Sequence, residues 1–261
     1  MNQASETNPL RSNAVLALLL WAGYVAFVMG LWWLFGIDYD VIGQPGNVML
    51  PLVIPIGGGG LLLALAVTRL GWWPSIMKET RLGQPRWMFW PLFGMFVFYT
   101  GQRLIGVQWS IEVLVPLISL IIGLACVGFS EELLHRGILV HGLSSGLPEV
   151  AVWFVSSALF GLLHVPNGFF TAGGFDESLT QAGYAFLTGS ALYGVRRLGG
   201  NLLICMLLHF LWDFAALSLA IAGGGLSGLL NAIGIFGLYG VAVIVLSYVL
   251  WNDRNSKKSA N

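Results

Sequence analysis

Long apolar runs separated by short polar connections dominate this chain. A helix that crosses a membrane needs about 20 consecutive, mostly apolar residues. By this measure the pattern predicts about eight spans, at residues 13–36, 47–68, 87–106, 111–130, 150–165, 179–195, 201–222 and 228–251. We therefore expect an all-α, polytopic transmembrane helical bundle that forms a single integral-membrane domain over residues 1–261, with a mobile polar tail at 252–261.

The composition supports this prediction. Hydrophobic residues make up 57% of the 261 residues and charged residues 9%, whereas soluble domains carry about 25% charged residues. The first apolar run is too long for a signal-peptide core, so we interpret it as a retained span. The 12 basic residues balance the 12 acidic ones, and this balance gives no indication of a nucleic-acid partner.

The distribution of charge predicts an orientation. Nearly all Lys and Arg residues fall in the connections on one side of the predicted spans. The other side carries Arg103 together with acidic residues, which are Asp38, Asp40, Asp176 and Glu177. Because positive residues favour the cytoplasmic side, we expect both termini to be cytoplasmic.

One cluster of charges lies at the end of an apolar run, in the sequence Phe129-Ser130-Glu131-Glu132-Leu133-Leu134-His135-Arg136. A charge in lipid costs roughly 2.5 to 3.5 kcal/mol on insertion scales, so such a cluster indicates a functional site. On a helix, Glu132 and Arg136 share a face and are expected to pair. Glu131 points about 100° away from Glu132 around the helix axis and has no local cation. The predicted topology places this cluster at the cytoplasmic mouth of the span 111–130.

Two further spans carry ionisable groups. Phe160 and His164 lie four residues apart at the end of one span, and His209 and Asp213 have the same spacing in another. Each pair therefore shares a helix face, and in lipid such polar groups face the bundle interior. A carboxylate and an imidazole that share a water can deprotonate it, while a second histidine stabilises an oxyanion. The alternative is that these are hydrogen-bonded structural polar groups.

Other chemistries have weaker signals. Cys126 and Cys205 lie in apolar runs, where a structural disulfide is not expected. Cys205 precedes His209 by one helical turn, but a small packing residue is the favoured interpretation because a buried thiol is unreactive. We expect His135 and His141, which follow the span 111–130, to be at the surface or the interface. The sequence contains no HExxH, GxSxG or Walker motif.

Three short motifs in this order resemble those of a known family. They are Glu131-Glu132-x-x-x-Arg136, Phe160-x-x-x-His164 and His209-x-x-x-Asp213. Together they resemble the three motifs of the CPBP intramembrane proteases, which include type II CAAX prenyl endopeptidases and bacteriocin-processing (Abi) proteins. The similarity covers a core at residues 111–222.

The resemblance implies roles for these residues. Glu131 and His164 would activate the hydrolytic water, while His209 and Asp213 would stabilise the oxyanion or bind substrate. Supporting residues would be Glu132, Arg136 and Phe160. The third motif of the family often ends in Asn, whereas Asp213 can donate a hydrogen bond only when protonated. No cofactor is certain, although a divalent metal such as zinc, held by Glu131, His164 and His209, is a possible addition.

The predicted function is an intramembrane endopeptidase that processes a CAAX-type or bacteriocin-type peptide near the cytoplasmic face. Its cavity would lie between the spans 111–130, 150–165 and 201–222 and open to the cytosol. Its partners would be a peptide or membrane-protein substrate and lipid, with no nucleic acid, and its location a bacterial plasma membrane. Two alternatives stay open: a non-enzymatic bacteriocin-immunity or membrane scaffold protein, and a small transporter that relays protons through Glu131, His164 and His209.

Overall fold

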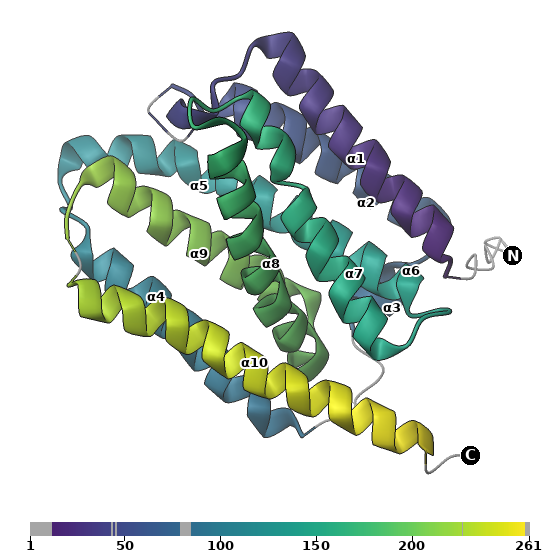
Figure 1. The fold of residues 1–261 in the computed structure, drawn as a ribbon. Coiled ribbons are helices and arrows are strands. Elements are labelled where there is room, and N and C mark those ends of the chain that lie inside the picture. Colours follow the sequence, from purple (N-terminus) through teal and green to yellow (C-terminus); the bar gives the residue numbers. More distant parts are fainter. Residues whose placement is uncertain (1–11, 43, 45, 79–84, 226, 259–261) are drawn as a thin grey trace, which may run out of the picture.

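A computed structural model describes residues 12–258 of the chain, apart from residues 43, 45, 79–84 and 226. Every named element in this part is helical (Figure 1). In chain order they are α1 (Ala14–Phe35), η1 (Tyr39–Val41), η2 (Met49–Gly57), α2 (Gly58–Leu70), α3 (Trp73–Met77), η3 (Arg86–Met88), α4 (Phe89–Gly106), α5 (Ile111–Glu132), η4 (Leu133–Leu139), α6 (Val140–Leu143), α7 (Glu149–Leu162), η5 (Val165–Phe169), α8 (Gly174–Gly199), α9 (Leu202–Ala222) and α10 (Gly228–Lys258). The expected all-α bundle is confirmed.

Six helical stretches are long and apolar enough to cross a membrane, by length and composition, within the described residues. They are Ala14–Phe35, Met49–Leu70, Leu117–Leu143, Glu149–Phe169, Leu202–Ala222 and Gly228–Asn255. The prediction of eight spans differs from this count because α4 and α8, at the positions of the third and sixth predicted spans, are not among the six. The chain is an integral membrane protein.

Helix α8 lies in the middle of the bundle, between α7 and α10 (Figure 1).

Short polar residues define where the spanning helices begin. The side chain of Asn13 accepts hydrogen bonds from the backbone N–H groups of Val15 and Leu16 and so starts α1. Asn201 caps α9 in the same way through Leu203. Such caps satisfy backbone donors that have no partner inside the helix. Both helices begin at the same end of the bundle (Figure 1).

The interrupted second span packs closely against its neighbours. Its first part, η2, contains Pro55 and is wound as a π-helix. Trp32 of α1 donates its indole N–H to the Pro51 carbonyl oxygen at 2.9 Å, which satisfies a backbone acceptor in this stretch. Gly60 lies so close to Ser130 of α5 that a Cβ atom there would collide with the hydroxyl group. Small residues here let α2 and α5 approach each other, as is common in membrane bundles.

The helix that carries Glu131 does not end at the charged cluster. It continues from α5 through the π-helical η4 into α6 and ends at Leu143. The expectation that the span stops at residue 130 is therefore wrong, and Glu131 lies near the middle of the apolar stretch Leu117–Leu143. The charges do not terminate the helix because partners inside the protein satisfy them, so no aqueous loop is needed. Single π-helical turns of this kind are frequent at functional sites.

The structure differs from two further expectations, one about three arginines and one about the C-terminal tail. Arg136, Arg196 and Arg197, which we counted among the cytoplasmic connections, are buried inside the bundle. Arg197, for example, pairs with Glu149 and lies over the ring of Tyr193. Helix α10 continues through Lys258, so most of the predicted tail 252–261 extends the helix, and residues 259–261 lie outside the described part.

Candidate active site

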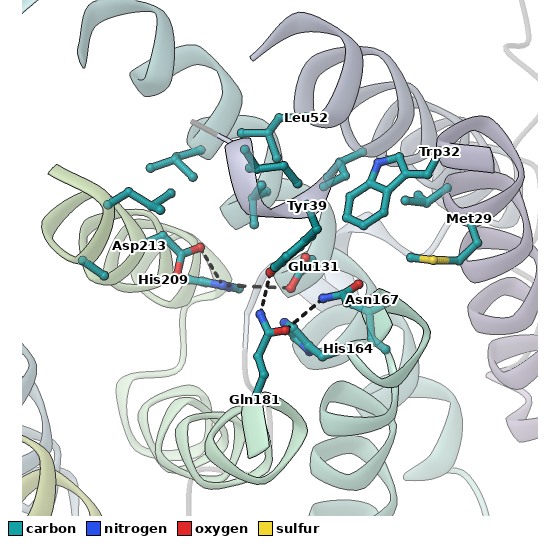
Figure 2. Close-up of a pocket in the computed structure, with 18 of the residues that line it drawn as sticks. Met29, Trp32, Tyr39, Leu52, Glu131, His164, Asn167, Gln181, His209 and Asp213 are labelled. Carbon is teal, nitrogen blue, oxygen red and sulfur yellow. Dashed lines mark hydrogen bonds and ion pairs between the residues drawn. The ribbon is translucent and has the colours of Figure 1, made fainter. Parts of the chain in front are cut away.

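The four residues predicted to carry out the chemistry line one cavity. Glu131 from α5, His164 after α7, and His209 and Asp213 from α9 share a space of about 250 Å³ (Figure 2). Apolar side chains of α1, η2 and α5 form much of the remaining wall, among them Val28, Met29, Trp32, Leu52, Ile56 and Leu124. The cavity therefore combines an apolar surface with a few convergent ionisable groups, which is the usual character of a ligand site.

Behind this cavity lies a buried charge network. Arg136 donates to Glu132 Oε1 at 2.8 Å, as the spacing of four predicts, and neither side chain is more than 2% exposed. The same carboxylate oxygen lies 2.9 Å from Nδ1 of His209, on a different helix. Glu132 is thus the residue that ties α9 to η4. A buried charge is tolerated because it is paired and hydrogen-bonded in this way.

Phe160 is the common neighbour of three functional elements. Its ring lies edge-on to the imidazoles of His164 and His209, with centroids 5.4 Å and 5.6 Å away. The guanidinium of Arg136 stacks over the same ring at 4.3 Å. A cation over an aromatic face is attracted by the negative charge density of the ring. These contacts place Phe160 between Arg136 and both histidines, which agrees with the supporting role predicted for it.

His209 is surrounded by carboxylates. Its Nε2 atom lies 3.3 Å from Asp213 Oδ2, one helical turn away, and 4.0 Å from Glu131 Oε2. His209 is 5% exposed, whereas the Asp213 side chain is 27% exposed. Carboxylates on both sides of the ring fix its orientation, because each ring nitrogen faces an acceptor.

The backbone fixes the protonation pattern of neutral His164. Its Nδ1 atom lies 2.9 Å from the carbonyl oxygen of Phe160. Because a carbonyl can only accept, Nδ1 carries the hydrogen in this contact. In the neutral imidazole the other nitrogen, Nε2, then has a free lone pair. His164 is therefore held in the tautomer that a general base requires.

Glu131 keeps one oxygen unused. Its Oε2 atom is buried in the cavity wall and has no hydrogen-bond partner among the described residues, and Nε2 of His209 lies 4.0 Å from it. In the part of the chain that the structure describes, no hydrogen bond or ion pair joins Glu131 to His164. An unsatisfied buried carboxylate oxygen is costly unless water or a ligand binds to it. Glu131 and His164 therefore line one cavity without a direct hydrogen bond between them.

His135 was misjudged from the sequence. We expected it at the surface or the interface, but it is fully buried. Its Nδ1 atom lies 2.7 Å from the carbonyl oxygen of Glu131, and Trp21 of α1 donates to its Nε2 atom at 3.2 Å. The expectation failed because the helix continues inward past residue 130. The spacing of four between Glu131 and His135 was the signal that pointed to this contact.

Three further polar residues of the cavity had no signal in the motifs. Gln181 of α8 donates to the hydroxyl oxygen of Tyr39 at 2.6 Å and accepts from Asn167 at 3.0 Å (Figure 2). All three side chains line the cavity beside Glu131 and His164. They come from η1, η5 and α8, and only the folded chain brings these elements together.

The residues present do not form a ready metal site. Among the described residues, no group of three His, Cys, Asp or Glu side chains is placed to hold a metal ion. In the predicted ligand set, Nδ1 of His209 already faces Glu132 and Nε2 faces Asp213. Nδ1 of His164 is bound to the Phe160 carbonyl. The mechanism proposed for these residues therefore uses no metal ion.

A protein-family model matches the part of the chain that builds this site. The family is described as type II CAAX prenyl endopeptidase Rce1-like, and the match covers residues 113–215. This range contains all three motifs. The resemblance is confirmed.

The matched family indicates a hydrolase, a CAAX-type intramembrane endopeptidase that acts on a peptide or membrane-protein substrate. The match spans fewer than half of the 261 residues. No curated protein and no solved structure matches the chain.

Proposed function

We propose that the chain hydrolyses a peptide bond in this cavity, with Glu131 and His164 as the groups that activate water. The observation that carries the proposal is the unpartnered Oε2 atom of Glu131, buried in a cavity that His164 also lines. A water that bridges the carboxylate and the free Nε2 atom of His164 is positioned to lose a proton. The wall of apolar side chains favours a substrate with apolar residues beside the cleaved bond.

The chemistry follows from these positions. The water oxygen attacks the carbonyl carbon, and its proton passes to the Glu131–His164 pair. The carbonyl oxygen becomes an oxyanion, which His209 stabilises by donating its Nε2–H in a hydrogen bond shared with Asp213 Oδ2. The C–N bond then breaks, and the stored proton moves to the leaving nitrogen. The products are a free amine and a new carboxylate.

Asp213 takes a positioning role in this proposal. Its Oδ2 atom lies 3.3 Å from Nε2 of His209, so as a carboxylate it accepts a hydrogen bond there. It orients His209 and stabilises its protonated form. The Asn that the family motif often carries would instead donate a hydrogen bond, so the departure at residue 213 changes how the oxyanion is bound without removing the catalytic pair.

The test is cleavage of an internally quenched peptide pool, varied at apolar positions, by the full chain in proteoliposomes. Glu131→Gln and His164→Ala should each abolish cleavage while insertion and the thermal unfolding midpoint stay near the wild-type values. Glu112→Gln is the matched control, because Glu112 is an exposed carboxylate at the start of the same helix. Cleavage that persists in both site variants contradicts the proposal.

The same experiment separates the non-enzymatic alternative. An immunity or scaffold protein would cut no member of the pool, and Glu131→Gln would affect only its folding or its binding to a membrane partner. A wild-type protein that is folded and cuts nothing therefore overturns the hydrolase proposal and favours that alternative.

A further inference from the structure

The proposed mechanism leaves the oxyanion short of one donor. Oxyanion sites usually present two or more hydrogen-bond donors to the developing charge. His209 offers one N–H, but the Asp213 carboxylate beside it only accepts. We look for a further donor on another side chain of the cavity, and the uncharged candidates there are Tyr24, Tyr39, Asn167 and Gln181.

The Tyr39 hydroxyl is held by a hydrogen bond that leaves its proton for the cavity, whereas no hydrogen bond among the described residues orients the Tyr24 hydroxyl. Asn167 donates its amide to Oε1 of Gln181 at 3.0 Å, which leaves the Nε2 end of Gln181 to face Tyr39. Gln181 Nε2 then donates to the phenol oxygen at 2.6 Å. Because the oxygen accepts in this contact, its own proton is directed elsewhere. In the view of Figure 2 this hydroxyl lies between His209 and Asn167, beside Glu131.

The segment that carries Tyr39 is fixed at several points. The backbone N–H of Tyr39 donates to the Phe170 carbonyl at 2.8 Å. The neighbouring Asp40 carboxylate accepts from the Thr171 hydroxyl at 2.5 Å and from the Ala172 N–H at 2.8 Å. The Tyr39 ring also lies against Trp32, with centroids 5.7 Å apart. A donor held this firmly needs little reorganisation when charge develops, and this is the condition for strong stabilisation.

We propose that Tyr39 is a catalytic residue whose hydroxyl donates a hydrogen bond to the carbonyl oxygen of the bond being cleaved. Gln181 and Asn167 act as positioning residues for it. This inference rests on the hydrolase function proposed above. Burial in the cavity wall raises the pKa of Tyr39 to about 12, so the hydroxyl keeps its proton over the physiological range.

The test separates kcat from KM. Tyr39→Phe keeps the ring and removes the donor, so kcat should fall by roughly 100-fold or more, with KM changed less than about 3-fold and the unfolding midpoint unchanged. Gln181→Leu should reduce kcat less, because the donor stays but is no longer oriented. Tyr248→Phe on α10 is the matched control, since Tyr248 does not line the cavity.

Three outcomes have different meanings. A Tyr39→Phe variant with kcat within about 3-fold of wild type overturns the Tyr39 inference while Glu131→Gln stays inactive, and the hydrolase proposal then stands. Full cleavage by Glu131→Gln overturns the hydrolase proposal itself. A lower unfolding midpoint for Tyr39→Phe with an unchanged kcat assigns Tyr39 a structural role and also contradicts the inference.

The exposed charges carry a second, independent inference. Helices α2, α3 and α10 end, and η3 leads into α4, at the end of the bundle where α1 begins (Figure 1). The exposed cations of these termini are Arg69, Lys78, Arg86 and Arg254. Exposed carboxylates lie at the other end, beside the connections that carry Tyr39 and Asn167: Asp38, Asp40, Asp176 and Glu177. Half-buried Arg103 also lies at this second end and donates to Asn231. Positive residues favour the cytoplasmic side.

We infer that the cavity opens toward the extracytoplasmic side, so that a peptide reaches it from there. Its wall includes Tyr39, Ile42 and Asn167 from the connections at the acidic end. The expectation of cleavage near the cytoplasmic face depended on a span that ended at residue 130. The continuous helix to Leu143 removes that basis, because Glu131 no longer lies at a cytoplasmic mouth.

Cysteine labelling tests the access side in intact cells. A membrane-impermeant maleimide should label Asp38→Cys before lysis, whereas Lys78→Cys should be labelled only after lysis. Unaltered protein gives the background, because Cys205 is buried and Cys126 is half-buried. The reverse pattern, with Lys78→Cys labelled first, overturns the inference. This result does not depend on activity, so it stands apart from the hydrolase test.

Discussion

The Nδ1 atom of His209 lies 2.9 Å from Glu132 Oε1, the oxygen that also accepts from Arg136. The Oε2 atoms of both Glu131 and Glu132 are buried without a hydrogen-bond partner among the described residues, but Glu132 Oε1 has a partner on each side, whereas Glu131 lines the cavity. In the proposed mechanism this difference makes Glu132 the bracing acid and Glu131 the reactive one.

Replacing the bracing acid should affect stability. Glu132→Gln removes the negative charge that pairs with Arg136 and faces His209, and it leaves a buried guanidinium without a counter-charge. Removing one partner of a buried pair costs roughly 3–5 kcal/mol, so we expect a clearly lower unfolding midpoint in detergent. The exposed-site variant Glu112→Gln should unfold like wild type. Equal midpoints for both variants would contradict the bracing role.

Packing beside Phe160 should be equally sensitive. A Cβ atom at Gly189 of α8 would lie 2.8 Å from Cδ1 of Phe160 and 2.9 Å from Nη2 of Arg136. Overpacking of this kind costs about 1–3 kcal/mol, and the shift of Phe160 should also lower kcat. Gly183→Ala is the matched control on the same helix, because its Cβ would meet nothing within 4 Å. Stability and rate are measured for both, and a neutral Gly189→Ala would argue against the role of Phe160.

The contact between Asp40 and the connection after η5 should weaken in acid. Hydrogen bonds from Thr171 and the Ala172 N–H hold the pKa of Asp40 below its ordinary value of 3.8. A lowered pKa means that the contact is fully present above 3.8 and is lost as pH falls through the folded-state value. Hydrogen-exchange protection of the Ala172 amide should therefore decrease when the pH falls below the folded-state pKa of Asp40. In Asp40→Asn the protection should not vary over this range; a retained pH dependence would contradict the assignment.

Metal removal should leave the activity unchanged. The described His, Cys, Asp and Glu side chains form no ligand group, and the nitrogens of His209 already face carboxylates. Dialysis against a strong chelator should therefore change kcat by less than about 2-fold. The cleavage assay with and without added zinc checks this result. Loss of activity that zinc restores would show that a metal assembles at the site when substrate or ion is present.

The sequence was informative where partners lie within one helical turn. The contacts between Glu132 and Arg136, Phe160 and His164, and His209 and Asp213 all follow from a spacing of four, and each is present. The apolar runs likewise indicated an all-helical membrane bundle.

The rest depended on contacts between distant elements. The sequence gives no rule that brings Tyr39 to Gln181, which is 142 residues away, or Trp21 to His135. Hydropathy also suggested that the span ends at its charges, but internal pairing lets the helix continue to Leu143. A polar residue in an apolar run is therefore assigned correctly only when its partners are known.

The central claim is that Glu131 and His164, from separate helices, share one water. An experimental structure that resolves ordered waters tests it most directly. We expect a water within about 3.2 Å of both a Glu131 carboxylate oxygen and His164 Nε2. A dry space between the two side chains, or separate waters that each contact one of them, would contradict the account.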